Sequence, residues 1–124
     1  MCYNIIMSKL LEQAKEVSKN AYCKYSGFPV GAAVLVASGK IYTGCNVENA
    51  SYPLCVCAER NAVAAAVAAG ERELQTIAIY SPNLKNCVPC GACRQVLAEF
   101  GVKTIITGEK TYTLEELLPE GFCI

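Results

Sequence analysis

The sequence predicts an α/β fold, a three-layer α/β/α sandwich in which helices cover both faces of a mixed, mostly buried central sheet. Segments with helical apolar spacing alternate with short, almost wholly apolar segments that are typical of strands buried on both faces. Apolar residues make up 53% of the 124 positions, which is enough to form a core. A chain of this length has room for one domain, and we expect a single domain over residues 1–124.

The first predicted element is an amphipathic helix near the N-terminus. Ser8 is suited to cap this helix, because its hydroxyl can accept a hydrogen bond from a free backbone amide of the first turn. Apolar residues follow at three- and four-residue steps, namely Leu10, Leu11, Ala14, Val17 and Ala21. This spacing puts them on one face, so the helix is expected to lie on an apolar surface. Residues 1–7 are assigned to no element.

A β-hairpin is predicted next. Residues 22–29 form a loop rich in turn formers and aromatic rings. Residues 30–37 are nearly all apolar and predict a strand, residues 38–39 predict a tight Ser-Gly turn, and residues 40–44 predict the returning strand. Residues 45–56 follow as an irregular polar segment.

The second half of the chain predicts two further helices and two buried strands before a short final helix. Residues 57–69 are mostly alanine and valine, which predicts a helix buried all round and closed by Gly70. The remaining predicted elements are a strand over 75–80, a loop over 81–88, a helix over 91–100 stopped by Gly101, a strand over 102–107, and a helix from Thr113 ended by Pro119.

Charge and residue content exclude several function classes. Eleven basic and eleven acidic residues cancel without forming a block of either sign, which disfavours a polynucleotide partner because such proteins normally carry a basic patch. Histidine is absent, which excludes histidine-dependent triads and dyads and every zinc site that needs imidazole. Any metal must therefore be held by sulfur or carboxylate.

The cysteines indicate a reducing compartment. The N-terminal residues lack the charged and apolar regions of a signal peptide, and no membrane span is visible, so we expect a cytoplasmic protein that contacts no membrane. In such a protein thiols are more often metal ligands or buried groups than disulfides. The nine cysteines are Cys2, Cys23, Cys45, Cys55, Cys57, Cys87, Cys90, Cys93 and Cys123.

Three of these thiols have the spacing of a catalytic zinc site. Cys57 opens one predicted helix, and Cys90 and Cys93 open another in the run P-C-x-x-C. Helix N-termini carry partial positive charge, which favours anionic thiolates. Zinc that performs chemistry usually takes three protein ligands and leaves a fourth position for water. The sequence therefore predicts Zn²⁺ on Cys57, Cys90 and Cys93.

Two neighbours of Cys57 are assigned roles beside this metal. Glu59 is the only carboxylate in either thiol segment, so it is the candidate catalytic proton acceptor. Three thiolates around one divalent ion leave an excess negative charge, and the guanidinium of Arg60 is placed to hydrogen-bond sulfur and withdraw it. Three other interpretations stay open on these residues alone: a closed four-thiolate structural zinc that uses Cys55 or Cys87, a redox pair, and a solvated helix start.

Four motifs in order resemble the small, homotetrameric, zinc-dependent cytidine deaminases of the cytidine/deoxycytidylate deaminase superfamily. They are Phe28-Pro-Val-Gly-Ala-Ala33, Gly44-Cys-Asn-Val-Glu-Asn-Ala50, Cys57-Ala-Glu-Arg60 and Pro89-Cys-Gly-Ala-Cys-Arg-Gln-Val-Leu97. A cysteine or histidine two residues before a glutamate, followed by P-C-x-x-C, is the signature of zinc deaminases. The likeness covers nearly the whole chain from about Ser8.

The resemblance implies a site beyond the metal. It implies that Asn46 and Glu48 bind the ribose 3′-hydroxyl, that Phe28 packs beside the base, and that the Ala58 backbone N–H meets the pyrimidine. It further implies a homotetramer in which Tyr52 and Phe122 complete the site of a neighbouring subunit. The sequence departs from the family at Lys24, where proline is frequent, at Ser81-Pro82, and at the extra thiols Cys55 and Cys87.

The expected function is the hydrolytic deamination of cytidine and 2′-deoxycytidine to uridine and 2′-deoxyuridine, a reaction of pyrimidine salvage. The alternatives are a related deaminase acting on a nucleoside antibiotic such as blasticidin S, and a non-catalytic zinc or thiol module. An editor of tRNA or single-stranded DNA is disfavoured by the balanced charge and short chain.

Overall fold

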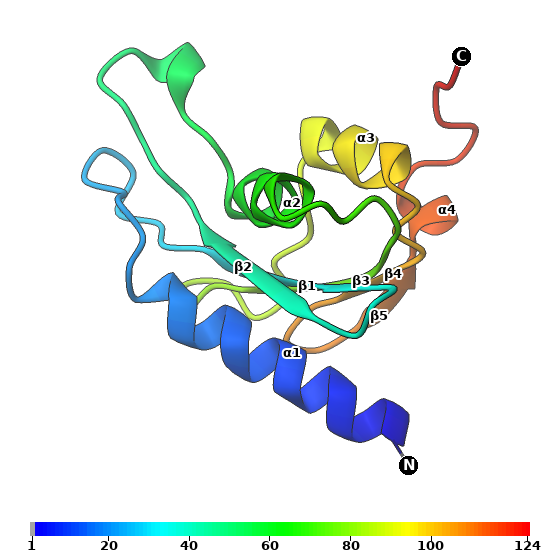
Figure 1. Cartoon of the computed structure of the whole chain (residues 1–124). Coiled ribbons are helices and arrows are strands. Elements are labelled where there is room, and N and C mark those ends of the chain that lie inside the picture. The colour runs from blue at the N-terminus through cyan, green and yellow to red at the C-terminus, as the bar shows by residue number, and fades with distance from the viewer. Residues whose placement is uncertain (1) are drawn as a thin grey trace.

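Helices and strands alternate along the chain much as the apolar pattern predicts (Figure 1). The computed structural model describes residues 2–124. The strands are β1 (Gly31–Val36), β2 (Ile41–Cys45), β3 (Leu74–Tyr80), β4 (Thr104–Ile106) and β5 (Thr111–Thr113). The helices are α1 (Cys2–Ser18), the 3₁₀ turn η1 (Tyr52–Leu54), α2 (Ala58–Ala68), α3 (Gly91–Glu99) and α4 (Leu114–Leu117). Within these described residues, no helix has the length and apolar content needed to cross a membrane.

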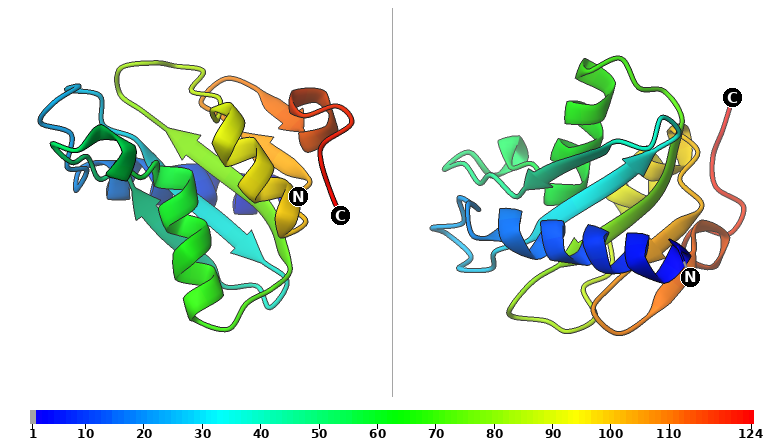
Figure 2. Two further views of the ribbon diagram at one scale, coloured as in Figure 1. Left: turned by 90° about the horizontal axis from the view of Figure 1, so that it is seen from above. Right: turned by 60° about the horizontal axis from the view of Figure 1, so that its bottom comes forward.

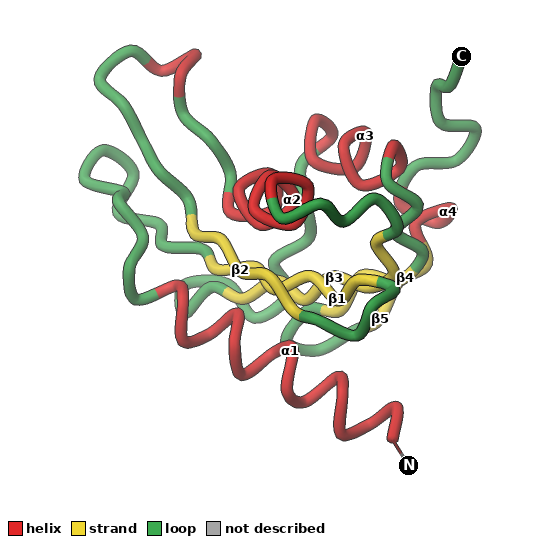
Figure 3. Tube along the Cα trace, viewed as in Figure 1, coloured by secondary structure: helices red, strands yellow, loops and turns green. Residues whose placement is uncertain are grey.

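The strands form one mixed sheet in the order β2-β1-β3-β4-β5, which Figure 3 shows as a central layer between helices. β1 pairs antiparallel with both β2 and β3, so the predicted hairpin is confirmed. Its turn is longer than the predicted pair of residues 38–39, because the backbone of Val36 bonds to Lys40 and residues 37–39 lie between them. β3 and β4 run parallel, and β5 returns antiparallel to β4. The predicted three-layer arrangement with a mixed sheet is therefore confirmed.

Alternation of side chains along β1 divides the core into two layers. Ala32, Val34 and Val36 are fully buried on the face covered by α2 and α3. The neighbouring Ala33 points to the opposite face, where it packs in the cluster that contains Leu10 of α1. Figures 1 and 2 show α1 crossing one face of the sheet while α2 and α3 lie over the other.

A glycine in β2 sets how closely α2 approaches the sheet. A Cβ atom at Gly44 would stand 2.4 Å from the backbone nitrogen of Ala62, so any side chain there would push the helix away. Only the face of α2 toward the sheet is buried, which corrects the prediction of a helix buried all round. The outer face of α2 carries three exposed alanines, Ala64, Ala65 and Ala68, and the C-cap residue Ala69 is exposed as well.

The N-terminal helix is longer at its start and shorter at its end than predicted. It begins at Cys2, and Ser8 lies in its interior instead of capping it. The apolar spacing continues backward through Met7, which packs against the same cluster as Leu10, so no break occurs at Ser8. The helix ends at Ser18, whose hydroxyl donates to the carbonyl of Lys15 at 2.6 Å.

Two differences from the predictions lie near the C-terminus. The strand predicted over 102–107 is regular only over Thr104–Ile106, although Val102 is buried. The strand β5, Thr111–Thr113, was not predicted, because three residues are too few to show a period of two. The last helix begins after Thr113 as predicted, and Thr113 and Glu116 form a capping box there.

Candidate active site

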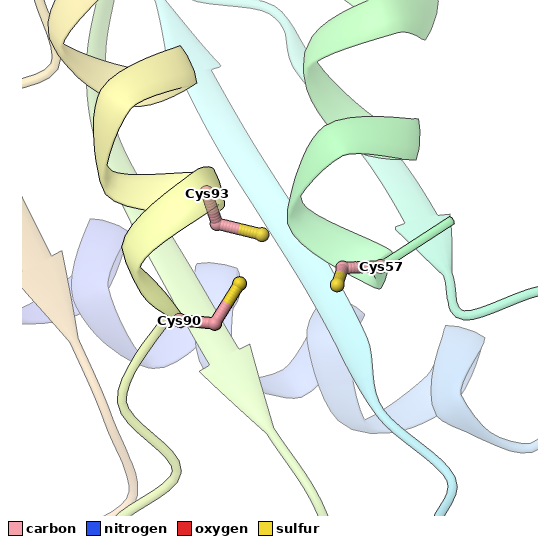
Figure 4. A group of neighbouring side chains, drawn as sticks. All are labelled: Cys57, Cys90 and Cys93. Atoms are coloured by element: carbon pink, nitrogen blue, oxygen red, sulfur yellow. The ribbon is translucent and has the colours of Figure 1, made fainter. Parts of the chain in front are cut away.

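The three predicted thiol ligands meet between the beginnings of two helices. Cys57 is the N-cap of α2, Cys90 is the N-cap of α3, and Cys93 lies in the first turn of α3. Their sulfur atoms all lie within 4.8 Å of one another. Figure 4 shows the three side chains pointing toward one another across the space between the helices. The spacing of the two motifs thus becomes one sulfur cluster in space.

The surroundings of the cluster favour thiolate at Cys57. Hydrogen bonding by the thiol of Cys93, together with the cation of Arg60, lowers the pKa of Cys57 to about 5. The pKa of Cys93 is raised, because its thiol retains the proton that it donates to Cys57. The positive ends of α2 and α3 face the same place. These surroundings therefore favour an anionic sulfur at Cys57.

Arg60 has the predicted contact with sulfur. Its Nη2 donates to the Sγ of Cys57 at 3.4 Å, and the contact raises the pKa of the guanidinium. The Nε atom of Arg60 is buried and has no hydrogen-bond partner. A buried donor of this kind is costly unless it faces concentrated negative charge. Three thiolates around a divalent ion carry such an excess charge, so the guanidinium fits this metal site.

The donor set suits zinc. Soft thiolates select zinc over magnesium or calcium, which prefer oxygen. Among the described residues, these three form the one group of three or more candidate ligands that converge on a common point. Three sulfur ligands leave zinc a fourth position, which is the arrangement of a catalytic site.

Neither of the extra thiols belongs to this cluster. The Sγ of Cys55 accepts a hydrogen bond from the backbone nitrogen of Asn49 at 3.3 Å, and Cys87 is buried in the core beside α2 and α3. The closed four-thiolate site, which the sequence left open, would need one of them as the fourth ligand. The structure holds both elsewhere.

Glu59 lies in the first turn of α2 with only 5% of its surface exposed. Burial, which disfavours the charged form, is the main reason that the pKa of its carboxyl is raised to about 7. The negative charge of Cys57 acts in the same direction. A carboxyl in this environment can both take up and release a proton near neutral pH.

Phe28, Asn46 and Glu48 lie together on a second part of the candidate site. The amide of Asn46 accepts from the backbone nitrogen of Val30 at 2.9 Å and donates to the carbonyl of Phe28 at 2.8 Å. The carboxylate of Glu48 accepts from the backbone nitrogens of Tyr25 and Ser26 at 3.0 and 3.1 Å. Both polar side chains therefore hold the loop that carries Phe28.

The other predicted substrate residues fall into two groups. Ala58 is the first residue of α2, where a backbone N–H has no partner within the helix. Tyr52 and Phe122 are 68% and 71% exposed, on η1 and on the segment after α4. The ring of Tyr52 makes an edge contact with Tyr25 at a centroid distance of 6.0 Å. Within this chain neither ring is covered.

Two residues that the sequence did not single out, Ser26 and Arg94, make hydrogen bonds that reach the candidate site. The hydroxyl of Ser26 accepts from the backbone nitrogen of Phe28 at 3.0 Å, and a serine two residues before that position is a recognisable turn signal. The guanidinium of Arg94 donates to the carbonyls of Pro89 and Leu117, each at 2.8 Å. Arg94 lies in the P-C-x-x-C-R run, but nothing in the spacing indicates its acceptors.

Comparison with known proteins agrees with this geometry. Residues 5–109 match the family model described as the cytidine and deoxycytidylate deaminase zinc-binding region. A cytidine deaminase from Sporosarcina psychrophila is 42% identical over 123 residues, which cover 94% of this chain and 90% of the relative. The crystal structure of cytidine deaminase from Mycobacterium tuberculosis has a TM-score of 0.88 at 40% identity, over 94% of this chain and 97% of that one. The structure from Burkholderia pseudomallei has a TM-score of 0.84 at 43% identity, over 93% and 98%.

Proposed function

The chain belongs to the cytidine and deoxycytidylate deaminase family, and from this premise we propose that it converts cytidine and 2′-deoxycytidine to the uridine nucleosides and ammonia. The observation that carries this proposal is the cluster of Cys57, Cys90 and Cys93 with the buried carboxyl of Glu59 beside it. Relatives over most of the chain are named cytidine deaminases. The reaction consumes one water per nucleoside and would serve pyrimidine salvage.

The proton transfers are assigned to Glu59. Zinc held by the three cysteines supplies Lewis acidity, which lowers the pKa of water toward neutrality. Glu59 accepts a proton from the water that attacks C4 of the pyrimidine, and it delivers protons to ring N3 and then to the departing amine. Its burial supports this assignment, because a pKa of about 7 lets one carboxyl both accept and donate.

The substrate contacts are assigned to the residues around the cluster. The free N–H of Ala58 at the start of α2 is proposed to meet the pyrimidine, and Phe28 to pack beside it. Asn46 and Glu48 are proposed to receive the sugar hydroxyls. The hydrogen bonds that these two side chains make to the Phe28 loop support a shared location for base and sugar contacts.

A homotetramer with shared sites is part of the proposal. Tyr52 and Phe122 are large exposed rings, and the exposed residues of α2 are all alanines. Small apolar side chains on a helix allow close approach of a second backbone, and closed symmetry is the common solution for copies of one chain. The proposed partners are the nucleoside and copies of this chain.

A cytoplasmic location and the absence of a nucleic-acid partner are proposed on chemical grounds. The cysteines from Cys23 to Cys123 are free thiols, which suits a reducing compartment. Eleven acidic residues balance eleven basic ones, so the chain lacks the excess positive charge that binds phosphate backbones.

The test is an ultraviolet assay for loss of the cytidine chromophore. We expect conversion of cytidine and 2′-deoxycytidine by the zinc-loaded protein, and loss of conversion when a chelator removes the metal. Glu59→Gln should retain zinc while turnover falls by about 10²- to 10⁴-fold, the usual contribution of a general acid–base group. Glu73→Gln, which changes an exposed carboxylate, is the matched control.

Three outcomes would overturn the proposal. Zinc-loaded protein that leaves both nucleosides unchanged would refute the reaction. Near-normal turnover by Glu59→Gln would remove this residue from the proton transfers. Faster turnover of blasticidin S than of cytidine would assign the chain to the antibiotic-directed branch of the family.

A further inference from the structure

The hydroxyl of Ser26 lies between the carboxylate of Glu48 and the backbone of Phe28. Its Oγ is hydrogen-bonded to Oε2 of Glu48, and the backbone nitrogen of Phe28 approaches the same Oγ at 3.0 Å. A hydroxyl has one proton to donate and lone pairs with which to accept. Because an ionised carboxylate only accepts, the Ser26 proton points to Glu48, and the Phe28 N–H donates to Ser26.

The hydrogen bonds leave Glu48 with one open acceptor site. A carboxylate has about four lone-pair positions. Oε1 accepts from the backbone nitrogens of Tyr25 and Ser26, and Oε2 accepts from the Ser26 hydroxyl. One lone pair of Oε2 therefore has no donor among these contacts. Glu48 and Ser26 both line a hollow of about 280 Å³, together with Tyr25, Tyr52 and Cys55.

The ionised state of Glu48 is supported by the same contacts. Hydrogen bonding by the Ser26 hydroxyl is the main reason that the pKa of Glu48 is lowered from its ordinary value, and the two backbone donors add to it. The carboxylate therefore remains an acceptor at neutral pH. It can receive a hydroxyl group, whereas a second anion in the same place would be repelled.

We propose that Ser26 is a positioning residue, which orients Glu48 so that the open lone pair of Oε2 faces the hollow and receives the 3′-hydroxyl of the nucleoside sugar. This inference rests on the proposed function, because it specifies how that site selects its substrate. Ser26 acts through Glu48 and does not itself touch the substrate. Without its hydroxyl, Oε1 remains bound to the two backbone nitrogens, but Oε2 loses its only fixed donor and its lone pair is no longer held toward the hollow.

The chain offers a matched control for this contact. In the β1–β2 turn, the hydroxyl of Ser38 donates to a carboxylate oxygen of Glu71 at 3.0 Å. This is the same pair of chemical groups, also exposed, and it lies at the opposite end of the hairpin from Gly44 and Cys45. Ser38→Ala therefore removes an equivalent hydrogen bond at a position that has no part in the proposed site.

The experiment compares cytidine with 3′-deoxycytidine, which lacks the hydroxyl that Glu48 is proposed to receive. For Ser26→Ala we expect KM for cytidine to rise about 10-fold with kcat nearly unchanged, because a charge-assisted hydrogen bond that orients bound substrate is lost. With 3′-deoxycytidine the same variant should differ from the unmodified protein by no more than about twofold, because the contact is already missing. Ser26→Thr retains the hydroxyl and should restore KM, and Ser38→Ala should change neither substrate.

The outcomes separate this inference from the function on which it rests. Equal losses on both substrates would show that Ser26 acts through the Phe28 loop or through folding, which overturns the assignment. An unchanged KM for cytidine in Ser26→Ala would overturn it as well. Absence of deamination in the unmodified protein would instead refute the proposed function. Thermal unfolding of each variant shows whether the fold is intact, and Ser26 is exposed, so we expect little change.

Discussion

Two cysteines near the centre of the molecule have opposite chemistry because their surroundings differ. Cys57 lies at a helix N-terminus beside Arg60, and its pKa is lowered to about 5. Cys87 is 8% exposed and packs in the core, and burial raises its pKa to about 11, with the nearby carboxylate of Glu59 acting in the same direction. Identical thiols are therefore suited to bind a metal in one place and to stay protonated in the core in the other.

The buried thiol predicts how stability depends on alkaline pH. Between the ordinary pKa of 9.0 and the folded value of about 11, folded Cys87 keeps a proton that the unfolded chain releases. The free energy of unfolding should therefore fall as pH rises through this window, by about 2 kcal/mol from this group alone. In Cys87→Ala the fall should be smaller by that amount, as measured by urea unfolding of the zinc-loaded protein at several pH values.

Cys123→Ala is the control, because it removes an exposed thiol. It should keep the pH dependence of the unmodified protein. If Cys87→Ala and the unmodified protein lose stability in parallel between these pH values, the thiol of Cys87 is not protected by the fold.

At the residue scale, groups with strict chemical requirements could be predicted from the sequence. Cys57, Cys90 and Cys93 were found by their spacing, and the predicted contact of Arg60 with sulfur is confirmed. Ser26 was missed because its partner is 22 positions away, and no local pattern indicates that pairing. Whether Cys55 or Cys87 closes the metal site was equally undecidable, because both lie close to the ligands in sequence.

At the scale of elements, the apolar spacing predicts the helices and strands correctly where the segments are long, but it predicts their first and last residues less accurately. The hairpin and the helices α2 and α3 are where the apolar pattern placed them, because each has a glycine or cysteine at its end. The start of α1 was misplaced because a serine that can cap a helix can also lie inside one, as Ser8 does. The strand β5 depends on pairing with β4, which only the folded chain reveals.

One residue of α3 connects the segment before Cys90 to the end of α4. The guanidinium of Arg94 donates to the carbonyl of Pro89, directly before Cys90, and to the carbonyl of Leu117 at the end of α4. Hydrogen bonds from a charged donor are about twice as strong as neutral ones. The peptide before Cys90, the N-cap of α3, is therefore fixed by a side chain from the first turns of the same helix.

We expect Arg94→Met to weaken retention of the metal. Loss of both hydrogen bonds should free the Pro89–Cys90 peptide and raise the rate at which a chromogenic chelator removes zinc by about 10-fold, the equivalent of about 1.4 kcal/mol. Arg94→Lys should recover only part of this loss, because one ammonium does not reproduce the planar fork that reaches two carbonyls. Zinc release is followed directly, so the result does not depend on turnover.

Arg72→Met is the matched control for this variant. Arg72 also donates to two backbone carbonyls, those of Val67 and Glu71, but at the exposed end of α2 away from the thiols. It should release zinc at the rate of the unmodified protein. Equal zinc release from the Arg94 and Arg72 variants would show that the contact to Pro89 does not support the metal site.

At the scale of the whole molecule, the apolar groups left uncovered lie on several separate elements. Tyr52 lies on η1, Phe122 follows α4, and exposed alanines lie on α2, which covers the sheet face opposite α1 (Figure 1). Isolated exposed apolar side chains are ordinary, but two aromatic rings and a helix face with three exposed alanines in one small chain indicate surfaces made for contact. Copies of the chain are the proposed occupants.

The shared-site proposal predicts rescue when two inactive variants are mixed. Glu59→Gln lacks the proton acceptor but keeps its Phe122, and Phe122→Ala lacks the ring but keeps its Glu59. If Phe122 completes the site of a neighbouring subunit, hybrids formed after mild dissociation and reassociation contain some sites with both groups intact. Deamination by the mixture should therefore exceed the summed activity of the two variants alone, and light scattering should report a mass about four times the 13.3 kDa of one chain.

Mixing Glu73→Gln with Phe122→Ala controls for simple dilution. A strictly additive mixture would place Phe122 in its own subunit's site or in none, and a monomeric mass would refute the assembly itself.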